Sequence, residues 1–286
     1  MTSNDTIACI GELLWDVLPD GRALGGAPAN VAYHLAQLGH TATLVTRVGR
    51  DELGHAARAA LVAHRLGVAE VQFDDALPTG AAHVTLDAHG HAEYHFVTPA
   101  AFDAVVQPTW KPGVVVFGTL AQRDGRSAET IRRTAAGARI AAYDVNLRPP
   151  HTPLETVVAS LPLATLVKLN ADEAALLAAA LDVPAEPREL ARHISARYGP
   201  RLVCVTRGGD GAGLWTRGEW HDAPGIPAAT LDTVGAGDAF LAALLAGWLE
   251  GRAPAEALER ANRLGAYVAA QRGAVPEYDA SALRMR

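Results

Sequence analysis

A glycine-rich run, Asp232-Thr-Val-Gly-Ala-Gly-Asp238, directly precedes a stretch that is apolar on nearly every side and predicts a buried helix over residues 238–250. A glycine-rich turn that enters a helix leaves unpaired backbone N–H groups at the positive end of the helix dipole. Such a terminus binds anions, phosphate in particular. The local residues also allow a second interpretation, in which Gly-Ala-Gly is a tight turn and Asp238 caps the helix.

A second glycine-rich loop, Leu24-Gly-Gly-Ala-Pro-Ala-Asn30, also leads into a predicted helix. Adjacent glycines let a ligand approach the backbone closely, and the Asn30 amide can donate to and accept from neighbouring hydroxyl groups. The alternative is a plain helix start with Pro28 in its first turn. The presence of this second loop favours a phosphate site at the first.

Two further clusters of polar residues follow predicted strands. Asn170-Ala-Asp-Glu173 fits a helix N-cap with a glutamate at its third position, a role that still lets the glutamate face a metal-bound water. Asp144-Val-Asn146-Leu-Arg148 ends an apolar strand, where ligands collect in open α/β sheets. Arg148 suits a phosphate or a carboxylate because its guanidinium is planar, and a surface salt bridge is the alternative.

Two common nucleotide-binding motifs are absent from the sequence. No Gly-x-x-x-x-Gly-Lys-Ser/Thr run occurs, since Lys111 and Lys168 are the only lysines, and no Gly-x-Gly-x-x-Gly run follows the first predicted strand. The sequence therefore gives no support to a P-loop or a Rossmann dinucleotide site.

The composition is that of an ordinary globular protein. Of the 286 residues, 49% are hydrophobic and 20% are charged, which is enough apolar material for a large core. The net charge is −6 and the basic residues are scattered, so a small-molecule partner is expected rather than a nucleic acid or a membrane. Cys9 and Cys204 lie in apolar runs and are expected to be reduced core residues of a cytoplasmic protein.

Short apolar runs alternate with alanine-rich stretches along the chain, which predicts an α/β fold with a mostly parallel sheet covered by helices. The predicted strands are residues 7–11, 42–48, 114–118, 140–145, 166–169 and 202–206. The predicted helices are residues 29–38, 53–64, 128–137, 171–181, 188–198, 238–250 and 255–272.

Residues 82–96 break this pattern because apolar and polar side chains alternate, with a turn at residues 87–90. The alternation predicts an antiparallel hairpin with one wet face, which could form part of a lid over a site. Residues 13–24 are a second lid candidate, with a turn signal at Pro19-Asp-Gly21. The histidines of the hairpin fit a solvated or dimer-facing surface better than a metal site.

Taken together, these motifs resemble those of the ribokinase-like, or PfkB, carbohydrate kinases, and within them the bacterial fructokinase-like branch. The first signature of the family resembles the stretch from Gly25-Gly-Ala-Pro-Ala-Asn30 through Gly49-Arg-Asp51-Glu-Leu-Gly54, and the second resembles Asp232 to Asp238. The resemblance covers essentially the whole chain. It implies one ribokinase-like three-layer α/β domain over residues 1–286, with a small β-sheet lid formed by segments near residues 12–25 and 80–99.

The resemblance also implies roles for particular residues. Asp238 would be the general base that takes the proton from the attacking hydroxyl group, and the amides of Gly235, Ala236 and Gly237 would form an anion hole for the phosphoryl group. The residues implied to bind the sugar are Asp16, Gly25, Gly26, Asn30 and Arg148. Those implied to bind ATP and its phosphates are Lys168, Asn170, Glu173, Thr206, Gly208, Gly211 and Asn262.

Two metal sites are implied in the same way. Asn170 and Glu173 would organise Mg²⁺, through water, and Asp232, Val234, Ala269 and Gly273 would lie at a K⁺ site described for some relatives.

The implied activity is transfer of the γ-phosphoryl group of ATP to a sugar hydroxyl, with fructose as the leading substrate. The residues Tyr94-His-Phe-Val-Thr-Pro99 lack an arginine that many bacterial fructokinases carry in the lid, so 2-keto-3-deoxygluconate, ribose and nucleosides stay open as acceptors. A catalytically silent sugar-binding regulator is the alternative from another class. The resemblance further implies a homodimer that forms through the lid sheets.

Overall fold

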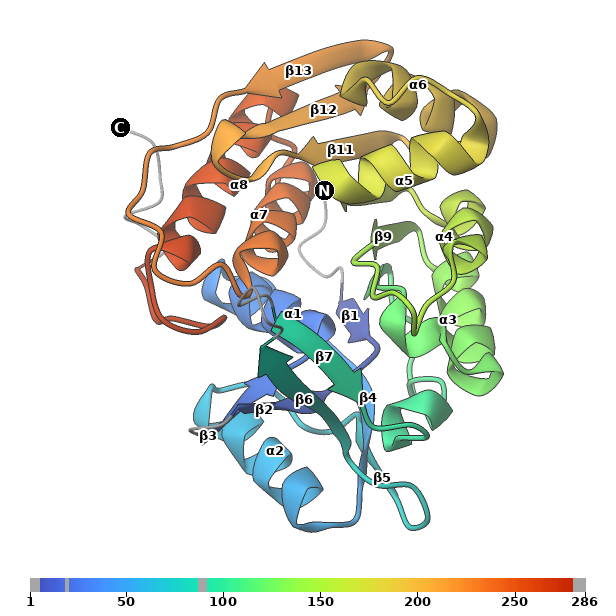
Figure 1. Ribbon diagram of the computed structural model, residues 1–286, viewed down its shortest axis with the longest axis vertical. Helices are drawn as coiled ribbons and strands as arrows, with labels where there is room; N and C mark the ends of the chain where they lie inside the picture. The colour runs from blue at the N-terminus through green and yellow to red at the C-terminus, as the bar shows by residue number, and fades with distance from the viewer. Residues whose placement is uncertain (1–5, 19–20, 87–91, 280–286) are drawn as a thin grey trace.

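The main sheet of the protein is an open, twisted sheet in a computed structural model that describes residues 6–18, 21–86 and 92–279 (Figure 1). Within these residues the sheet has nine strands in the order β13-β12-β11-β10-β9-β8-β1-β4-β5. The strands are β1 (Ile7–Ile10), β4 (Ala42–Gly49), β5 (Val71–Asp74), β8 (Val114–Phe117), β9 (Ile140–Asp144), β10 (Leu166–Asn170), β11 (Leu202–Thr206), β12 (Ala212–Thr216) and β13 (Glu219–Ala223). All neighbours pair in parallel except at β12 and β13, which pair antiparallel at one edge.

The central strands of this sheet, such as β1 and β8, are apolar at every position because both faces of the sheet are covered there. Side chains alternate between the faces along β1, so that Ile7 and Cys9 pack into one hydrophobic cluster while Ala8 and Ile10 pack into the other. Cys9 and Cys204 are buried and free, as predicted.

Helices form a layer on each face of the sheet. The helices of the first cluster are α1 (Ala27–Gln37), α2 (Glu52–Ala63), α7 (Ala236–Leu249) and α8 (Pro254–Ala269). The helices of the second cluster are α3 (Gly125–Gly137), α4 (Leu154–Ser160), α5 (Ala171–Leu181) and α6 (Pro187–Tyr198). Helix α7 is the most enclosed of the first layer, since it packs against both α1 and α8, and its apolar residues surround the helix accordingly.

A second, smaller sheet supplies the lid. It has four strands in the order β3-β2-β6-β7, with β2 at Leu14–Leu18, β3 at Gly21–Gly25, β6 at Gly80–Leu86 and β7 at Ala92–Phe96. Strands β6 and β7 pair antiparallel, as predicted for the hairpin, whose turn at residues 87–90 lies outside the described residues. Trp15 fastens the lid to the body because its indole Nε1 donates a 3.0 Å hydrogen bond to Leu53 O at the start of α2.

The order of the strands creates a switch point beside β1. The chain runs from β1 outward through β4 and β5, then returns to β8 on the other side of β1 and continues through β9 and β10. Loops that leave β1 and β8 therefore diverge at the carboxyl ends of these strands, where open α/β sheets bind their ligands. In Figure 1 the lid strands lie near this end of the sheet, close to α1.

The predicted α/β architecture and the lid are confirmed, and the differences are local. The six predicted strands and seven predicted helices are all present, with shifts of a few residues at their ends. Strands β5, β12 and β13 and helix α4 were not predicted, because they are short and mix apolar with polar residues. Helix α7 begins at Ala236 rather than at residue 238, and Gly235 is its N-cap, so the interpretation of Asp238 as the cap is wrong.

None of the helices in the described part of the chain has the length and apolar character that crossing a membrane requires.

Candidate active site

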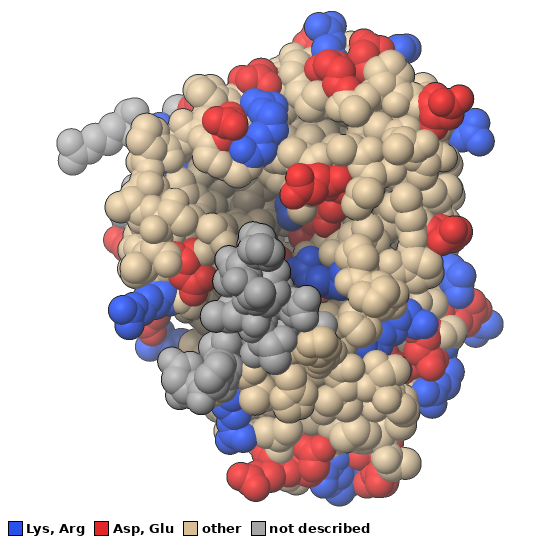
Figure 2. Space-filling model, in the orientation of Figure 1, with Lys and Arg blue, Asp and Glu red and all other residues tan. Residues whose placement is uncertain are grey.

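A cavity of about 490 Å³ opens at the carboxyl ends of the central strands, between the lid and the first turn of α7. Figure 2 shows this region as a hollow near the middle of one face, with acidic and basic side chains at its edge. Its lining comes from distant parts of the chain, including the lid strands β2 and β3, the start of α1, the loops after β1 and β9, and the turn before α7.

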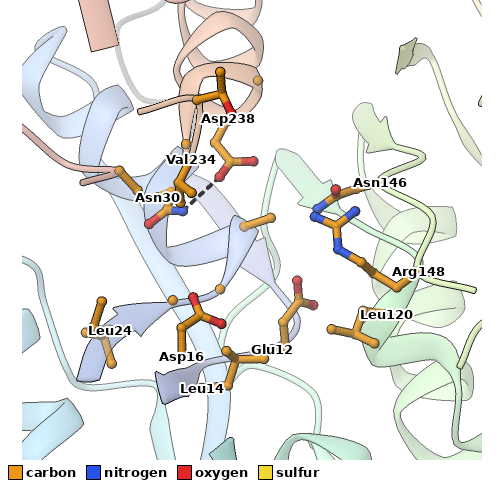
Figure 3. Close-up of a pocket in the computed structure, with 18 of the residues that line it drawn as sticks. Glu12, Leu14, Asp16, Leu24, Asn30, Leu120, Asn146, Arg148, Val234 and Asp238 are labelled. Atoms are coloured by element: carbon orange, nitrogen blue, oxygen red, sulfur yellow. Dashed lines mark hydrogen bonds between the residues drawn. The ribbon is translucent and has the colours of Figure 1, made fainter. Parts of the chain in front are cut away.

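Asp238 lies in this cavity in the first turn of α7. Its Oδ2 accepts a 2.8 Å hydrogen bond from Asn30 Nδ2, which projects from α1 (Figure 3). Both side chains are buried, with 9% of Asp238 and 7% of Asn30 exposed. The two glycine-rich loops of the sequence therefore meet at one point, with a carboxylate and an amide facing the same space.

The electrostatic surroundings of Asp238 suit a group that accepts a proton near neutral pH. Burial raises the pKa of Asp238 to about 6, and the nearby Asp144 carboxylate adds to the rise. The hydrogen bond from Asn30 and the charges of Lys168 and Arg148 oppose it. A carboxylate with such a pKa is ionised at pH 7 and is a stronger base than an exposed aspartate.

The turn before α7 depends on its glycines. Gly235 has a φ of +77° and packs so closely against Ala274 that no side chain fits there. A β-carbon on Gly237 would lie 3.0 Å from Lys168 Nζ. Gly235 and Gly237 line the cavity, whereas Ala236 does not, and the Ala236 amide donates a 3.3 Å hydrogen bond to Thr233 O.

Lys168 places a positive charge beneath this turn. Its Nζ lies 3.0 Å from Asp144 Oδ1, and both side chains are buried at neighbouring positions of β10 and β9. Burial alone would lower the pKa of Lys168, but the carboxylates of Asp144, Glu173 and Asp238 outweigh it and hold the pKa above its usual range. The ammonium group therefore stays charged close to Gly237.

The residues predicted to bind the sugar form the lid side of the cavity. Asp16 lies opposite Ala23 in the pairing of β2 with β3, and its side chain reaches Gly25 so closely that a β-carbon on Gly25 would lie 2.5 Å from Asp16 Oδ2. Gly26 has a φ of +123°, and a β-carbon there would lie 2.5 Å from Glu12 O. Burial raises the pKa of Asp16 while Arg148 opposes the rise.

Arg148 stands on the far wall, together with Asn146. Both follow β9, and Figure 3 shows their side chains across the cavity from Asp16 and Asn30. Arg148 Nη1 donates a 3.0 Å hydrogen bond to Leu147 O, which anchors the guanidinium at the cavity wall. The position of Arg148 in the cavity wall therefore favours a ligand over the surface salt bridge that was the alternative.

Asn170 and Glu173 form the predicted capping box at the start of α5. Asn170 Oδ1 accepts from Glu173 N at 2.9 Å, and Glu173 Oε2 accepts from Asn170 N at 2.9 Å. The other carboxylate oxygen, Glu173 Oε1, accepts from Leu147 N at 2.8 Å. Asn170 lines the cavity and Glu173 lies behind it, so Glu173 can reach a ligand there only through an intermediary such as water.

The residues predicted to bind the nucleotide lie in two groups. Thr206, at the end of β11, lines the cavity. Gly208 and Gly211 belong to the turn that follows, and Gly211 is packed against the backbone of Ala223. Asn262, on α8, donates to Ala223 O at 3.3 Å and to Pro224 O at 3.1 Å, so its amide holds the loop after β13.

The residues predicted to hold K⁺ are close together beside the turn before α7. Asp232 Oδ1 accepts from Val234 N and Asp232 Oδ2 accepts from Gly273 N, both at 3.0 Å. The Asp232 N–H in turn donates to Ala269 O at 3.1 Å. Asp232 therefore ties the glycine-rich turn to the segment that follows α8, and Asp232, Val234 and Gly273 line the cavity while Ala269 lies behind them.

The sequence analysis gave no role to Glu12, and in the run from Asp144 to Arg148 it assigned a ligand to Arg148 alone, although Asn146 also lines the cavity. Glu12 lines the cavity directly after β1, where its side chain is only 3% exposed. Its place just beyond the first strand was the available signal, because loops that leave a central strand form the ligand crevice.

Known proteins have sequences similar to that of this chain. Residues 19–280 match the family model described as pfkB family carbohydrate kinase. The chain is 33% identical over 266 residues to a fructokinase of Klebsiella pneumoniae, covering 85% of this chain and 84% of that protein. It is 30% identical over 308 residues to fructokinase-2 of Zea mays, covering 96% and 91%.

A solved structure also shares the fold. The fructokinase of Vibrio cholerae O395, as a double mutant with bound fructose, ADP and potassium ion, aligns with a TM-score of 0.84 at 25% identity. The alignment covers 96% of this chain and 95% of that one. The ribokinase-like α/β fold with its small lid sheet is thereby confirmed.

Proposed function

The chain belongs to the pfkB family of carbohydrate kinases, and we propose that it transfers the γ-phosphoryl group of ATP to a hydroxyl group of fructose. The observation that carries the proposal is the buried Asp238 carboxylate, fixed by Asn30 at the first turn of α7 and open to the cavity. The names of the Klebsiella and maize relatives, and the fructose in the Vibrio structure, support fructose as the acceptor.

Asp238 acts as the general base. It takes the proton from the attacking sugar hydroxyl as the oxygen forms its bond to the γ-phosphorus, while the bond from that phosphorus to the bridging oxygen breaks and ADP leaves. The pKa of about 6 keeps Asp238 ionised at pH 7, and the bond from Asn30 holds one carboxylate oxygen so that the other faces the hydroxyl.

The charge that develops on the phosphoryl group is met by the turn before α7. The first N–H groups of a helix have no partners inside the helix, and Gly235 and Gly237 both line the cavity. The Ala236 amide joins them if its long bond to Thr233 O opens. The ammonium group of Lys168 lies directly beneath Gly237 and adds a fixed positive charge.

Mg²⁺ is the metal that such a reaction uses, and the residues present fit a Mg²⁺ ion that they contact through water molecules. The oxygens of Asn170 and Glu173 already accept backbone hydrogen bonds and have lone pairs left, so they would hold Mg²⁺ through water rather than directly. The chemistry that a bound Mg²⁺ would supply there is neutralisation of the negative charge of the phosphates. For K⁺, the Asp232 carboxylate and the backbone around Ala269 and Gly273 supply oxygen atoms of the type that this ion binds.

The two substrates occupy opposite ends of the cavity. Asp16, Gly25, Gly26 and Asn30 hold the sugar on the lid side, and Thr206 with the turn at Gly208 and Gly211 holds the nucleotide. Asn262 serves the nucleotide end through the backbone of Ala223 and Pro224. The chain acts as a single domain with the lid over the sugar, and a homodimer through the lid stays a prediction.

An ADP-release assay over fructose, ribose, 2-keto-3-deoxygluconate and nucleosides tests this function. We expect fructose to give the highest kcat/KM, and the rate to depend on Mg²⁺. A strong preference for another acceptor would overturn the fructose assignment. Sugar binding without ADP release across the whole panel would instead identify a silent sugar-binding regulator.

A further inference from the structure

Helix α1 carries two buried polar side chains, Asn30 and His34, which are four residues apart and therefore lie on the same face of the helix. Asn30 binds Asp238 (Figure 3). His34 lies one turn further along and is 0% exposed, in a helix whose other buried residues are mostly apolar. A buried polar atom without a partner costs free energy, so both ring nitrogens of His34 need hydrogen-bond partners.

Both partners of His34 belong to the segment that follows α8. Its Nε2 lies 2.9 Å from Ala274 O, and its Nδ1 lies 3.0 Å from the Tyr278 hydroxyl group. A carbonyl oxygen only accepts, so Nε2 carries the proton and donates to Ala274 O. The unprotonated Nδ1 then accepts from Tyr278, whose other acceptor, His34 O, is farther away at 3.5 Å. Burial lowers the pKa of His34 to about 4, so the ring is neutral at pH 7, as this pattern requires.

Ala274 packs directly against the turn before α7. A β-carbon on Gly235 would lie 2.5 Å from Ala274 Cα and 2.4 Å from Ala274 Cβ, so the two residues touch with no space between them. The residue before Ala274 is bound to the same turn, because Gly273 N donates a 3.0 Å hydrogen bond to Asp232 Oδ2. The place of Gly235 therefore depends on where Ala274 is held.

Two tyrosines hold the same segment further along. Tyr33 Oη donates to Pro276 O at 3.1 Å, and Tyr267 Oη donates to Glu277 O at 3.2 Å. Of these side chains, His34 is the one that binds Ala274 itself. The residue behind Gly235 is thus fixed from α1, the same helix that fixes Asp238 through Asn30.

Resting on the proposed function, we propose that His34 is a positioning residue for phosphoryl transfer. By holding Ala274 O it keeps Ala274 against Gly235, and so keeps the turn before α7 in the shape that receives the phosphoryl group. His34 does not line the cavity and acts only through these two residues. One rigid helix then supports both the base and the anion-binding turn, which keeps the two in register.

The first test compares His34→Leu with His34→Gln. Leucine has no donor, whereas the amide nitrogen of glutamine lies as many bonds from the backbone as the histidine Nε2 and can donate to Ala274 O. We expect kcat to fall by about tenfold or more in His34→Leu, because a displaced anion hole stabilises the transition state less. The glutamine variant should recover most of that loss. The dissociation constant of fructose should stay within about threefold in both variants, since the lid side of the cavity is unchanged.

The matched control is Tyr33→Phe, which removes a bond to the same segment from the neighbouring residue of α1 and leaves Ala274 held. Its kcat should stay within about twofold of the wild type, while its loss of stability is similar in kind. In every variant kcat is referred to the protein that binds ATP in calorimetry, so that an unfolded fraction is not counted. A smaller fall in His34→Leu, no recovery in His34→Gln, or an equal fall in Tyr33→Phe would overturn the inference.

Amide hydrogen exchange over residues 232–240 gives a second readout that needs no turnover. The Val234 and Ala236 N–H groups donate to Asp232 Oδ1 and Thr233 O, so their exchange is slowed only while the turn keeps its shape. Exchange there should be faster in His34→Leu than in the wild type and in His34→Gln. Equal exchange in the wild type and in the leucine variant would overturn the inference.

Two further outcomes are covered by the same measurements. If His34→Leu does not fold, His34→Asn takes its place, because the shorter amide reaches the position of Nδ1 but not Ala274 O. If the wild type releases no ADP with any acceptor, the proposed function fails, and the exchange of residues 232–240 then decides alone whether His34 holds the turn.

Discussion

Asn30 Nδ2 donates a 2.8 Å hydrogen bond to Asp238 Oδ2, and the two residues are 208 positions apart in the chain. The bond joins the starts of α1 and α7, and with them the two glycine-rich loops. It also lowers the pKa of Asp238 against the effect of burial, so it contributes to both the orientation and the basicity of the carboxylate. Several consequences of this junction can be measured.

Replacing Asn30 by leucine removes the donor and raises the pKa of Asp238 further above 6. A general base must be ionised, so activity is lost as the pH falls through its pKa, and a higher pKa moves that loss to higher pH. The acidic limb of the kcat profile should therefore shift upward in Asn30→Leu. Asn146→Gly is the control, because it removes a cavity amide that does not contact Asp238 and suits the φ of +36° at that position. An acidic limb at the same pH in Asn30→Leu and in the wild type would show that the hydrogen bond from Asn30 does not lower the pKa of Asp238.

Asp238 also affects stability with a definite sign. Its pKa is raised from 3.8 to about 6, so the folded state resists its ionisation. The contribution of Asp238 to the free energy of unfolding is therefore fully present below about pH 4 and is lost as the pH rises through about 6. The loss amounts to roughly 2–3 kcal/mol. Asp238→Asn should be more stable than the wild type at pH 8 by about that amount in urea unfolding, and the difference should shrink towards pH 5. A difference that does not vary with pH would be inconsistent with a buried, ionised Asp238.

Gly25 has no room for a side chain because Asp16 Oδ2 occupies the space. Gly25→Ala should displace the Asp16 carboxylate and raise the KM for the sugar by about tenfold or more, while the KM for ATP stays close to the wild-type value. Gly21, in the same strand, has no atom within 4 Å of a β-carbon, so Gly21→Ala is the matched control. Similar sugar KM values in the two variants would argue against Asp16 as a sugar ligand.

Substitutions in the ion pair of Lys168 and Asp144 should affect the stability of the protein and its turnover differently. Lys168→Met leaves the Asp144 carboxylate buried without its partner, which should cost about 3–5 kcal/mol of unfolding free energy. Adding Asp144→Asn removes the unpaired charge and should recover most of that stability. Turnover should stay low in the double variant, because it lacks the Lys168 ammonium group beneath Gly237 just as the single variant Lys168→Met does. Recovery of turnover together with stability would show that Lys168 has only a structural role.

The fold was accessible from the sequence because its central strands are buried on both faces. Runs such as those at β1 and β8 are apolar at every position, so they stand out, and the alternation in β6 and β7 marks a sheet with one wet face. Strand β12 has only five residues, and the edge strand β13 mixes polar with aromatic residues. Their pairing depends on contacts with the rest of the sheet, which a local pattern does not contain.

The site could be predicted from the sequence only where a residue type is unusual for its position. Glycines before α1 and α7 pointed to close backbone approach, but the sequence could not place Asn30 next to Asp238. The sequence could not show that the Asn262 amide binds the backbone of Ala223 and Pro224, and its predicted place at the nucleotide stays a prediction. Glu12 was given no role because the sequence alone could not place it in the cavity, and the switch point beside β1 explains why it lies there.

The central claim is that Asp238 is the base in phosphoryl transfer, and Asp238→Asn tests it most directly. Turnover is measured by ADP release with fructose, and binding of ATP and of fructose is measured by calorimetry on the same protein. We predict that kcat falls by about 10²–10⁴-fold while both dissociation constants stay within about threefold of the wild-type values. A kcat within tenfold of the wild type, with both ligands bound normally, would contradict the account.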